Sequence, residues 1–218
     1  MKKIVIAPDS FKGTLSAIEI CNIINQEIEK VFPKCQVIST PIADGGEGTV
    51  ESFIMSVKGE KVIREVTGPY FEKVQSYYGL IDGGKTAIIE MAAAAGLPLV
   101  SGRENPLKTT TYGVGELILH AAQSGVKRII IGLGGSSTND GGCGLVAALG
   151  VKFLNKEGES FIPIGETLGE IAKIDTSNIN KKLIGIKMSA MCDVTNPLYG
   201  PKGAAHIFGP QKGADQEM

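Results

Sequence analysis

Short apolar runs and runs with helical spacing alternate over the first sixty residues. Residues 3–7 are almost entirely apolar and predict a buried strand. Ser16 and Glu19 form a capping box, and the apolar positions after them recur with the period of a helix. Residues 36–39 predict a second strand and residues 50–57 a second helix. Two successive β-loop-α units predict a parallel, doubly wound sheet.

The pattern changes after residue 62. Three extended segments follow, at residues 62–66, 74–81 and 87–91, and glycine-containing turns separate them. This arrangement predicts an antiparallel meander, which differs from the β-loop-α pattern before it. We therefore predict a domain boundary near residue 62, with residues 63–218 in a second, mixed α/β domain.

The second domain also contains a β-loop-α unit. Residues 111–124 predict an amphipathic helix, and residues 127–133 predict a strongly apolar strand. A long glycine-rich loop follows that strand and leads into a short helix at 143–149, and a further strand is expected near 183–190. The fold class predicted from these elements is α/β with two domains.

The first domain is predicted to be incomplete, because two β-α units cannot form a sheet with helices on both faces. The missing strands are expected either later in the chain or beyond Met218. Residues 196–218 predict loop structure and no terminating element, which favours the second alternative.

The charge, apolar runs and cysteines of the chain indicate which binding partners and which cellular location to expect. The chain has 218 residues, and its 22 basic and 23 acidic side chains leave a net charge of −1, so no basic surface indicates nucleic acid or an anionic membrane. No apolar run approaches the length of a membrane span or a signal-peptide core. The four cysteines are widely spaced, as in reduced cytosolic proteins, and we predict a cytoplasmic protein. The sequence does not indicate an oligomeric state.

Glycine is abundant, with 29 residues that gather in clusters. One cluster, residues 79–86, fits the P-loop pattern G-x-x-x-x-G-K-[ST]. A P-loop needs a strand before the glycines and a helix N-terminus after them. Here the glycines lie in a predicted hairpin turn, and the next residues continue as strand. We interpret this match as a coincidence.

The glycine-rich loop at residues 132–142 has the context that the P-loop match lacks, because a buried strand precedes it and a helix follows. Glycines allow close approach of an anion, and hydroxyl and amide groups bind phosphate oxygens. The alternative is an ordinary polar turn. A weaker dinucleotide pattern, G-x-G-x-x-A, lies at residues 142–147. The predicted nucleotide- or phosphate-binding residues are Gly134, Gly135, Ser136, Ser137, Thr138 and Asn139.

Two further loops, residues 9–13 and 44–48, follow the carboxyl ends of the first two strands. Open α/β sheets bind ligands at that edge. Each loop has an acid that alternatively serves as a plain turn residue. Carboxylates, lysines, hydroxyls and glycine amides suit phosphoryl transfer. The residues singled out are Ser10, Lys12, Asp44, Gly45 and Gly46, with Asp193, Asn196, Lys202 and Lys212 from later loops. Of the two histidines, His120 is interpreted as structural, and His206 has no assigned role.

At these same loops the chain resembles a known family. The segments are APDSFKGTLSA at 7–17, PIADGGEGT at 41–49, GLGGSSTNDGG at 132–142, CDVTNPLYGPKGAA at 192–205 and FGPQKGA at 208–214. They are long, collinear and spread over the whole chain. In these segments the chain resembles the bacterial glycerate kinases of the glycerate kinase I family.

The resemblance implies ATP-dependent, magnesium-dependent phosphorylation of D-glycerate to phosphoglycerate, with 2-phosphoglycerate favoured. It also implies a Rossmann-like first domain, an inserted second domain and a site in the cleft between them. Family members continue past residue 214 with a part that completes the first domain, so this chain is expected to lack that part. Its activity and independent folding then stay open.

The expected roles follow from chemistry and from this resemblance. Residues 134–139 are expected to hold ATP phosphates. Asp44, Asp193 and Lys12 are the candidate catalytic residues, and the two acids are also candidates for holding Mg²⁺. Ser10, Lys12, Gly45, Gly46, Asn196, Lys202 and Lys212 are candidate substrate-binding residues. Two alternatives stay open: a dinucleotide-dependent oxidoreductase, and an inactive fragment that binds nucleotide or nothing.

Overall fold

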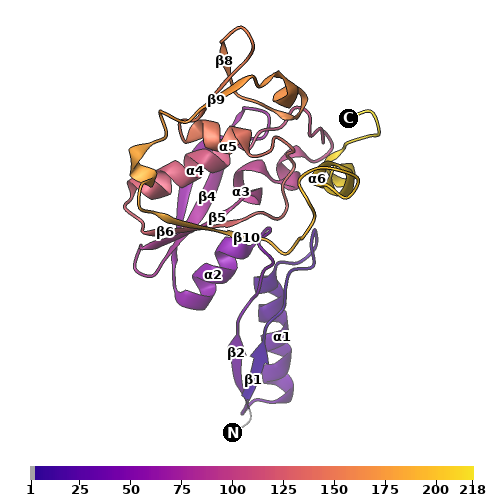
Figure 1. The fold of residues 1–218 in the computed structure, drawn as a ribbon. Coiled ribbons are helices and arrows are strands. Elements are labelled where there is room, and N and C mark those ends of the chain that lie inside the picture. The colour runs from indigo at the N-terminus through magenta and orange to yellow at the C-terminus, as the bar shows by residue number, and fades with distance from the viewer. Residues whose placement is uncertain (1–2) are drawn as a thin grey trace.

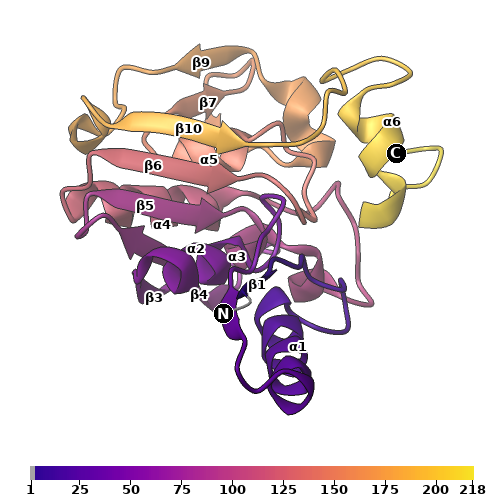
Figure 2. The same cartoon turned by 90° about the horizontal axis from the view of Figure 1, so that it is seen from below.

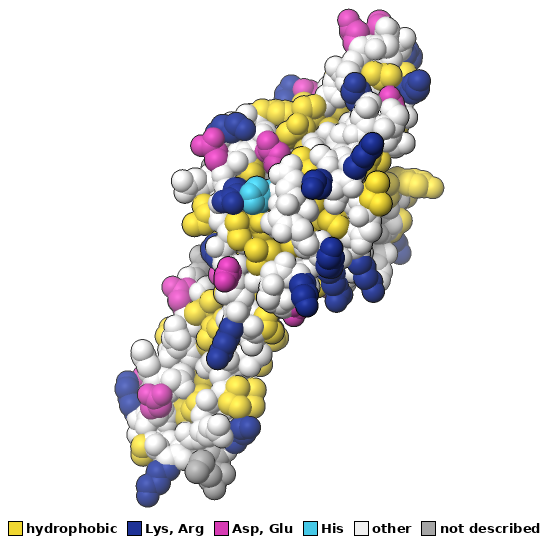
Figure 3. Space-filling model, turned by 90° about the vertical axis from the view of Figure 1, so that its left-hand side faces the viewer, with side chains coloured by type: hydrophobic (Ala, Val, Ile, Leu, Met, Phe, Trp, Pro, Cys, Tyr) yellow, Lys and Arg dark blue, Asp and Glu magenta, His cyan; other side chains and the backbone are white. Residues whose placement is uncertain are grey.

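The computed structural model describes residues 3–218. The N-terminal part is a narrow arm of two strands and one helix, β1 (Lys3–Ile6), α1 (Ala17–Val31) and β2 (Gln36–Ser39), which extends away from a broader body (Figure 1). The space-filling view in Figure 3 shows the arm as a slender lobe at one end of the molecule. The strands pair in parallel, Lys3 opposite Gln36, as the β-loop-α pattern predicts.

The helix of the arm begins where the sequence predicts. The Ser16 hydroxyl accepts a hydrogen bond from the Glu19 amide at 3.2 Å, and the Glu19 carboxylate accepts one from the Ser16 amide at 2.8 Å. The predicted capping box is therefore confirmed. Both residues satisfy donors that the first turn of a helix leaves unpaired.

The body is built on a five-stranded mixed sheet with strand order β10-β6-β5-β4-β3. The hairpins β3-β4 and β4-β5 are antiparallel, which confirms the meander, whereas β5-β6 and β6-β10 are parallel. The P-loop pattern lies in the β4-β5 hairpin turn. The strands are β3 (Glu60–Thr67), β4 (Lys73–Ile81), β5 (Thr86–Glu90), β6 (Arg128–Gly132) and β10 (Lys187–Met191).

Helices cover both faces of this sheet (Figures 1 and 2). On one face, Ala87 and Ile89 of β5 join the core that contains Leu117 of α4. On the other face, Ile88 packs with Val50 of α2. Neighbouring strand residues point to opposite faces, so β5 is buried along its whole length. The helices are α2 (Thr49–Val57), α3 (Ala92–Ala95), α4 (Tyr112–Gln123) and α5 (Cys143–Ala148).

The placement of α2 differs from the doubly wound prediction. The helix was expected to cover the first sheet, but its apolar residues, Val50 and Ile54, pack on β4 and β5 of the body. The sequence pattern shows that α2 has an apolar face and does not show which sheet that face covers. The domain boundary near residue 62 stays a prediction.

A small antiparallel sheet with order β8-β7-β9 and a C-terminal segment complete the described chain. The prediction of loop structure for 196–218 is wrong in part, because residues 204–208 form a helix that starts after Gly203. The remaining elements are β7 (Lys152–Leu154), β8 (Ser160–Phe161), β9 (Lys173–Asp175), α6 (Ala204–Phe208) and the 3₁₀ helices η1 (Leu97–Val100), η2 (Gly165–Glu170), η3 (Lys181–Leu183) and η4 (Pro210–Lys212). Within residues 3–218, no helix combines the length and the apolar character that crossing a membrane requires.

Candidate functional site

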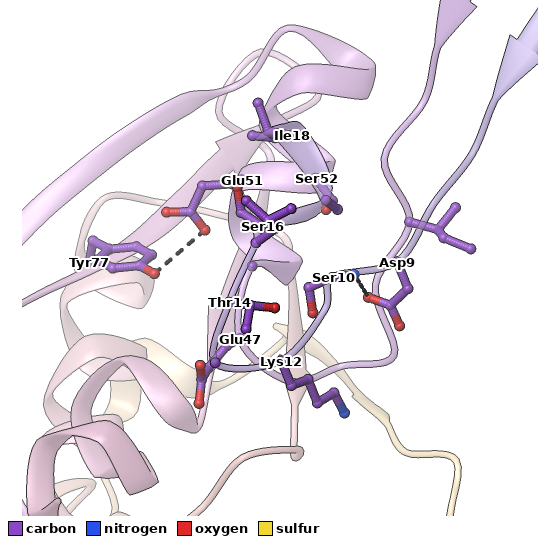
Figure 4. A pocket seen from close by; sticks show the side chains of 15 residues that line it. Asp9, Ser10, Lys12, Thr14, Ser16, Ile18, Glu47, Glu51, Ser52 and Tyr77 are labelled. Atoms are coloured by element: carbon purple, nitrogen blue, oxygen red, sulfur yellow. Dashed lines mark hydrogen bonds between the residues drawn. The ribbon is translucent and has the colours of Figure 1, made fainter. Parts of the chain in front are cut away.

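A cavity of about 370 Å³ lies where the arm meets the body. Its lining comes from the loop after β1, the start of α1, the loop after β2 and the start of α2, with one tyrosine from β4 (Figure 4). Hydroxyl, carboxylate and ammonium groups face it together. The polar lining residues are Asp9, Ser10, Lys12, Thr14, Ser16, Glu47, Glu51, Ser52 and Tyr77.

Lys12 and Asp44 form an ion pair at the edge of this cavity, with 2.6 Å between Nζ and Oδ2. The hydrogen bond to Asp44 raises the pKa of Lys12, and the charges of Asp44, Asp9 and Asp193 add to that rise against an opposing effect of burial. The same hydrogen bond lowers the pKa of Asp44, and the Gly46 amide, 2.9 Å from Oδ1, lowers it further. The charges of three acids from three different loops therefore act on one lysine.

The loop at residues 44–48, here called the acid loop, packs directly against the glycine-rich loop at 132–142. The Gly134 amide donates to the Gly45 carbonyl at 3.0 Å. A Cβ on Gly134 would lie 2.8 Å from the Cα of Gly46, which is closer than side chains tolerate. Glycine is required here because two backbones touch.

Inside the glycine-rich loop, the hydroxyls have different surroundings. Ser137 is buried, and its hydroxyl donates to the Ala95 carbonyl at 3.0 Å. This side chain therefore stabilises the conformation of the loop from its buried side. The Ser136 and Thr138 hydroxyls lie 2.8 Å apart. Gly135 has a positive φ of 72°, which directs the chain around the loop. Of the predicted serines, Ser136 is the more accessible.

Lys212, a candidate substrate-binding residue, reaches the glycine-rich loop from the C-terminal segment. Its Nζ lies 2.6 Å from the Thr138 carbonyl oxygen and 3.5 Å from the Ser136 hydroxyl. Burial lowers the pKa of Lys212, and the charge of Asp140 opposes this shift. A half-buried ammonium beside glycine amides and hydroxyls suits an anionic ligand.

Asp140 is a structural centre of the same loop. It is 1% exposed, and its Oδ2 accepts bonds from the Thr111 amide, the Thr111 hydroxyl and the Gly144 amide at 2.9, 2.7 and 3.1 Å. Its Oδ1 accepts a further bond from the Gly142 amide at 3.0 Å. These bonds connect the starts of α4 and α5, so Asp140 holds the loop in shape.

Other predicted residues lie apart from the cavity. Asn196 is exposed and donates to the Lys202 carbonyl at 3.1 Å, and the Lys202 side chain is also exposed. Asn139 lines a second cavity together with His206 of α6. Asp193 is exposed in the loop after β10, within electrostatic reach of Lys12. Their proposed roles remain predictions.

Sequence reasoning did not single out four acidic or aromatic residues near the site. Glu47 lies in the acid loop and Glu51 in the first turn of α2 just after it. Their charge beside this loop is the sequence signal that could have identified them. Tyr77 and Glu90 come from β4 and β5, far from the loops in sequence, and no motif marks them. Burial raises the pKa of Tyr77, whose hydroxyl lies 3.5 Å from the Glu51 carboxylate (Figure 4).

A metal ion and a nucleotide require different groups from the site. Residues 3–218 contain no group of three or more His, Cys, Asp or Glu side chains placed to hold a metal ion. Mg²⁺ commonly takes one or two carboxylates and completes its shell with phosphates and water, so Asp44 and Asp193 fit that role in number and type. The glycine-rich loop and Lys212 fit the phosphates of a nucleotide.

The fold defines an α/β protein, and these loops form a candidate site for a phosphate-type anion at the edge of its sheets. Comparison with known proteins gives the family: the profile of the glycerate kinase family matches residues 4–218. The chain belongs to that family.

Relatives with curated names agree. A glycerate kinase of Bacillus cereus is 52% identical over 217 residues, and a glycerate 2-kinase of Escherichia coli K12 is 50% identical over the same length. Both alignments cover 99% of this chain and 57% of the relative. The crystal structure of a protein assigned as glycerate kinase 2 from Salmonella typhimurium LT2 is 48% identical, with a TM-score of 0.87, and covers 100% of this chain and 59% of that one.

The chain therefore spans little more than half the length of the relatives it matches. The α/β prediction is confirmed by the same structural match. The relatives give no support to the dinucleotide-dependent oxidoreductase.

Proposed function

We propose that this chain carries the phosphoryl-transfer site of an enzyme that phosphorylates D-glycerate from ATP with Mg²⁺. The carrying observation is the backbone contact between the acid loop and the glycine-rich loop, 3.0 Å from the Gly134 amide to the Gly45 carbonyl. It sets a candidate acceptor site beside a candidate phosphate site, and phosphoryl transfer depends mainly on such positioning. Because ATP is an intracellular phosphoryl donor, we propose a cytoplasmic location.

The phosphates of ATP lie on the glycine-rich loop in this proposal. Gly134 and Gly135 bring the backbone close to them, and Ser136 offers its hydroxyl. Thr138 is buried, and its hydroxyl lies 2.8 Å from that of Ser136. Ser137 and Asn139 contribute through the loop's backbone, since the Ser137 hydroxyl already bonds Ala95. Lys212 neutralises phosphate charge.

Glycerate occupies the cavity beside Lys12 and Ser10. Its carboxylate competes with Asp44 for the Lys12 ammonium, because both carboxylates are attracted to the same positive charge. Asp44 then loses the partner that lowers its pKa and becomes a better proton acceptor for the reacting hydroxyl. Asp193 would hold Mg²⁺ there, and the ion would supply charge stabilisation for the transferred phosphoryl group. Asp44 would be a ligand only in place of its role as base, because a bound cation lowers the pKa of a carboxyl.

The name of the Escherichia coli relative, glycerate 2-kinase, supports the 2-hydroxyl as acceptor and 2-phosphoglycerate as product. Phosphorus NMR of the product distinguishes the two phosphate positions. Accumulation of 3-phosphoglycerate would reject this assignment and leave the kinase proposal intact.

The direct test is glycerate-dependent ADP formation from Mg-ATP, with the chain and its Asp44→Asn variant. We expect the variant to lose about 10²- to 10⁴-fold in kcat, the usual contribution of general acid-base catalysis. Glu27→Gln is a matched control, since Glu27 also pairs with a lysine, at 2.7 Å, but lies on the exposed face of α1. Normal turnover by Asp44→Asn would show that the site is misplaced. Absence of turnover in the parent chain with any hydroxy acid would reject the kinase proposal for this chain.

A further inference from the structure

Glu90 is a buried acid with no role in the proposed chemistry. It is the last residue of β5 and 1% exposed. Residues alternate between the two faces of a strand, and Ile88, two residues earlier, packs against α2. Glu90 therefore points from the sheet toward the beginning of α2.

The helix that Glu90 meets lacks a cap of its own. Gly48 occupies the N-cap position with a φ of 85°, and no side chain near it in sequence bonds the free amides of the first turn. Glu90 Oε1 instead accepts the Val50 amide at 2.5 Å, and the Gly48 amide lowers the pKa of the same carboxyl. A residue forty positions away thus performs the capping function that Ser, Thr or Asp usually performs locally.

We propose that Glu90 is the positioning residue of the acid loop: by capping α2 from β5, it holds the loop that carries Asp44. The connection is short. The Thr49 hydroxyl, at the first position of α2, donates to the Gly46 carbonyl at 2.7 Å, and the Gly46 amide donates to Asp44 at 2.9 Å. The link from loop position to turnover rests on the proposed function, whereas the capping contact does not.

An apolar side chain would fill this position at lower cost. Burying a carboxyl in a low-dielectric environment is unfavourable, and replacing buried polar groups by well-packed apolar ones is often neutral or stabilising. The neighbours of Glu90 in this layer, Val50, Ile81 and Ile88, are apolar. A carboxyl at this position is accounted for by the Val50 amide that it satisfies and by the start of α2 that this bond holds.

Charged and titratable groups from each packed element act on Glu90. Burial raises its pKa to about 7, and the charge of Glu51 on α2 adds to the rise. The amides of Val50 and Gly48 and the charge of Lys61 on β3 lower it. Tyr77 of β4 interacts electrostatically with Glu90 as well. An ionised carboxylate accepts stronger hydrogen bonds than a neutral carboxyl, so the cap strengthens as pH rises through neutrality.

Amide hydrogen exchange at Gly48 and Val50 tests the cap without any activity. Glu90→Met removes the acceptor, and Glu90→Gln keeps an oxygen but cannot ionise. We expect about tenfold or more faster exchange at Val50 in Glu90→Met, the effect of losing one strong hydrogen bond. In the parent chain, protection of Val50 relative to its intrinsic rate rises between about pH 6 and 8, around the pKa of Glu90. Glu90→Gln abolishes that rise.

Glu116→Gln is the matched control. Glu116 Oε2 accepts the Thr67 amide at 2.6 Å, a comparable side-chain-to-backbone bond remote from the acid loop. This variant is expected to leave Val50 exchange and its pH dependence unchanged. Unchanged Val50 exchange in Glu90→Met, or an equal change in Glu116→Gln, overturns the proposal.

Measuring turnover distinguishes the capping contact of Glu90 from its proposed effect on catalysis. If the parent chain phosphorylates glycerate, we expect Glu90→Met to reduce kcat by about 10- to 100-fold, because small displacements of catalytic groups are costly. Glu90→Gln is expected to lose the part of the kcat-pH profile that titrates near neutrality. Faster Val50 exchange with an unchanged kcat overturns the positioning role. Faster exchange in a chain that shows no kinase activity supports the cap and rejects the proposed function.

Discussion

The arm and the body of this protein bury their apolar side chains to very different extents. In the arm, Val5 is 62%, Val31 66% and Phe32 53% exposed. In the body, all five residues of β5 are buried, and helices cover both faces of the sheet. Isolated two-stranded sheets are marginal in water, whereas larger sheets with covered faces are stable. The body therefore supplies most of the stability of this chain.

The candidate functional residues are distributed in the opposite way to the buried apolar side chains. The arm's two strands lead into the loops that carry Lys12 and Asp44, and the body holds the acid loop through Gly134 and Glu90. The less covered of these two regions thus presents the candidate acceptor site. A functional loop on a marginal element depends on contacts from a rigid neighbour.

The largest expected difference between the two regions is in stability. Leu117→Ala removes a fully buried side chain of α4 from the core of the body, and we expect a loss of about 2–5 kcal/mol. Ile23→Ala alters an α1 side chain that is 49% exposed, and we expect less than about 1 kcal/mol. Urea denaturation of both variants measures the contrast. Similar losses would show that the arm is as well packed as the body.

The next effect is a loss of turnover with little loss of stability. Lys12→Met removes the ammonium that pairs with Asp44, and we expect kcat/KM for glycerate to fall by about 10²-fold or more. The Lys12 side chain is 71% exposed, so the free energy of unfolding changes by about 1 kcal/mol or less. Lys30→Met, in the exposed pair on α1, is the control and is expected to leave both quantities unchanged. A large loss of stability in Lys12→Met alone would make this pair structural.

The smallest effect concerns pH and the body. Arg64 Nε donates to His120 Nε2 at 2.6 Å, and the Tyr78 hydroxyl lies 2.9 Å from Nδ1. A proton on Nε2 would therefore point at the N–H of Arg64 and break this hydrogen bond. Burial, and then the charge of Arg64, lower the pKa of His120. The unfolded chain therefore binds this proton more readily, and the stability from His120 is complete above about pH 6.5 and lost as pH falls below it.

Comparing the parent chain with His120→Gln separates the contribution of His120 to stability from the contributions of other titrating groups. We expect the parent chain to lose about 1 kcal/mol or less, relative to His120→Gln, as pH falls from 7 to 5. His206→Gln, on the exposed helix α6, is expected to follow the parent chain. The arm contains no histidine. A parent chain and His120→Gln with parallel stability-pH curves would contradict this account.

Much of the local structure followed from the sequence. Ser16 and Glu19 indicated the start of α1, and the turn at 82–84 indicated a hairpin and not a P-loop. The glycine-rich loop was recognisable because an apolar strand precedes it and a helix follows. These are short-range signals, in which neighbouring residues suffice to select the conformation.

The candidate site was only partly predictable. Lys12, Asp44 and Lys212 were identified from charge and glycine context, and the structure brings Lys12 to Asp44 and Lys212 to the glycine-rich loop. Ser137 was grouped with the phosphate residues, yet its hydroxyl bonds Ala95. A sequence motif shows which groups are present and does not show which partners already satisfy them.

By itself, the sequence determined the α/β class, the order of the elements, the chemistry of the loops and the resemblance to glycerate kinases, because these depend on residue type and local periodicity. Only the tertiary structure decided that α2 covers the sheet of the body and that Glu90 caps it. Both depend on contacts between residues tens of positions apart, such as the 2.5 Å bond from the Val50 amide to Glu90. An apolar helix face packs equally well in principle on any apolar sheet, and only the folded chain selects one.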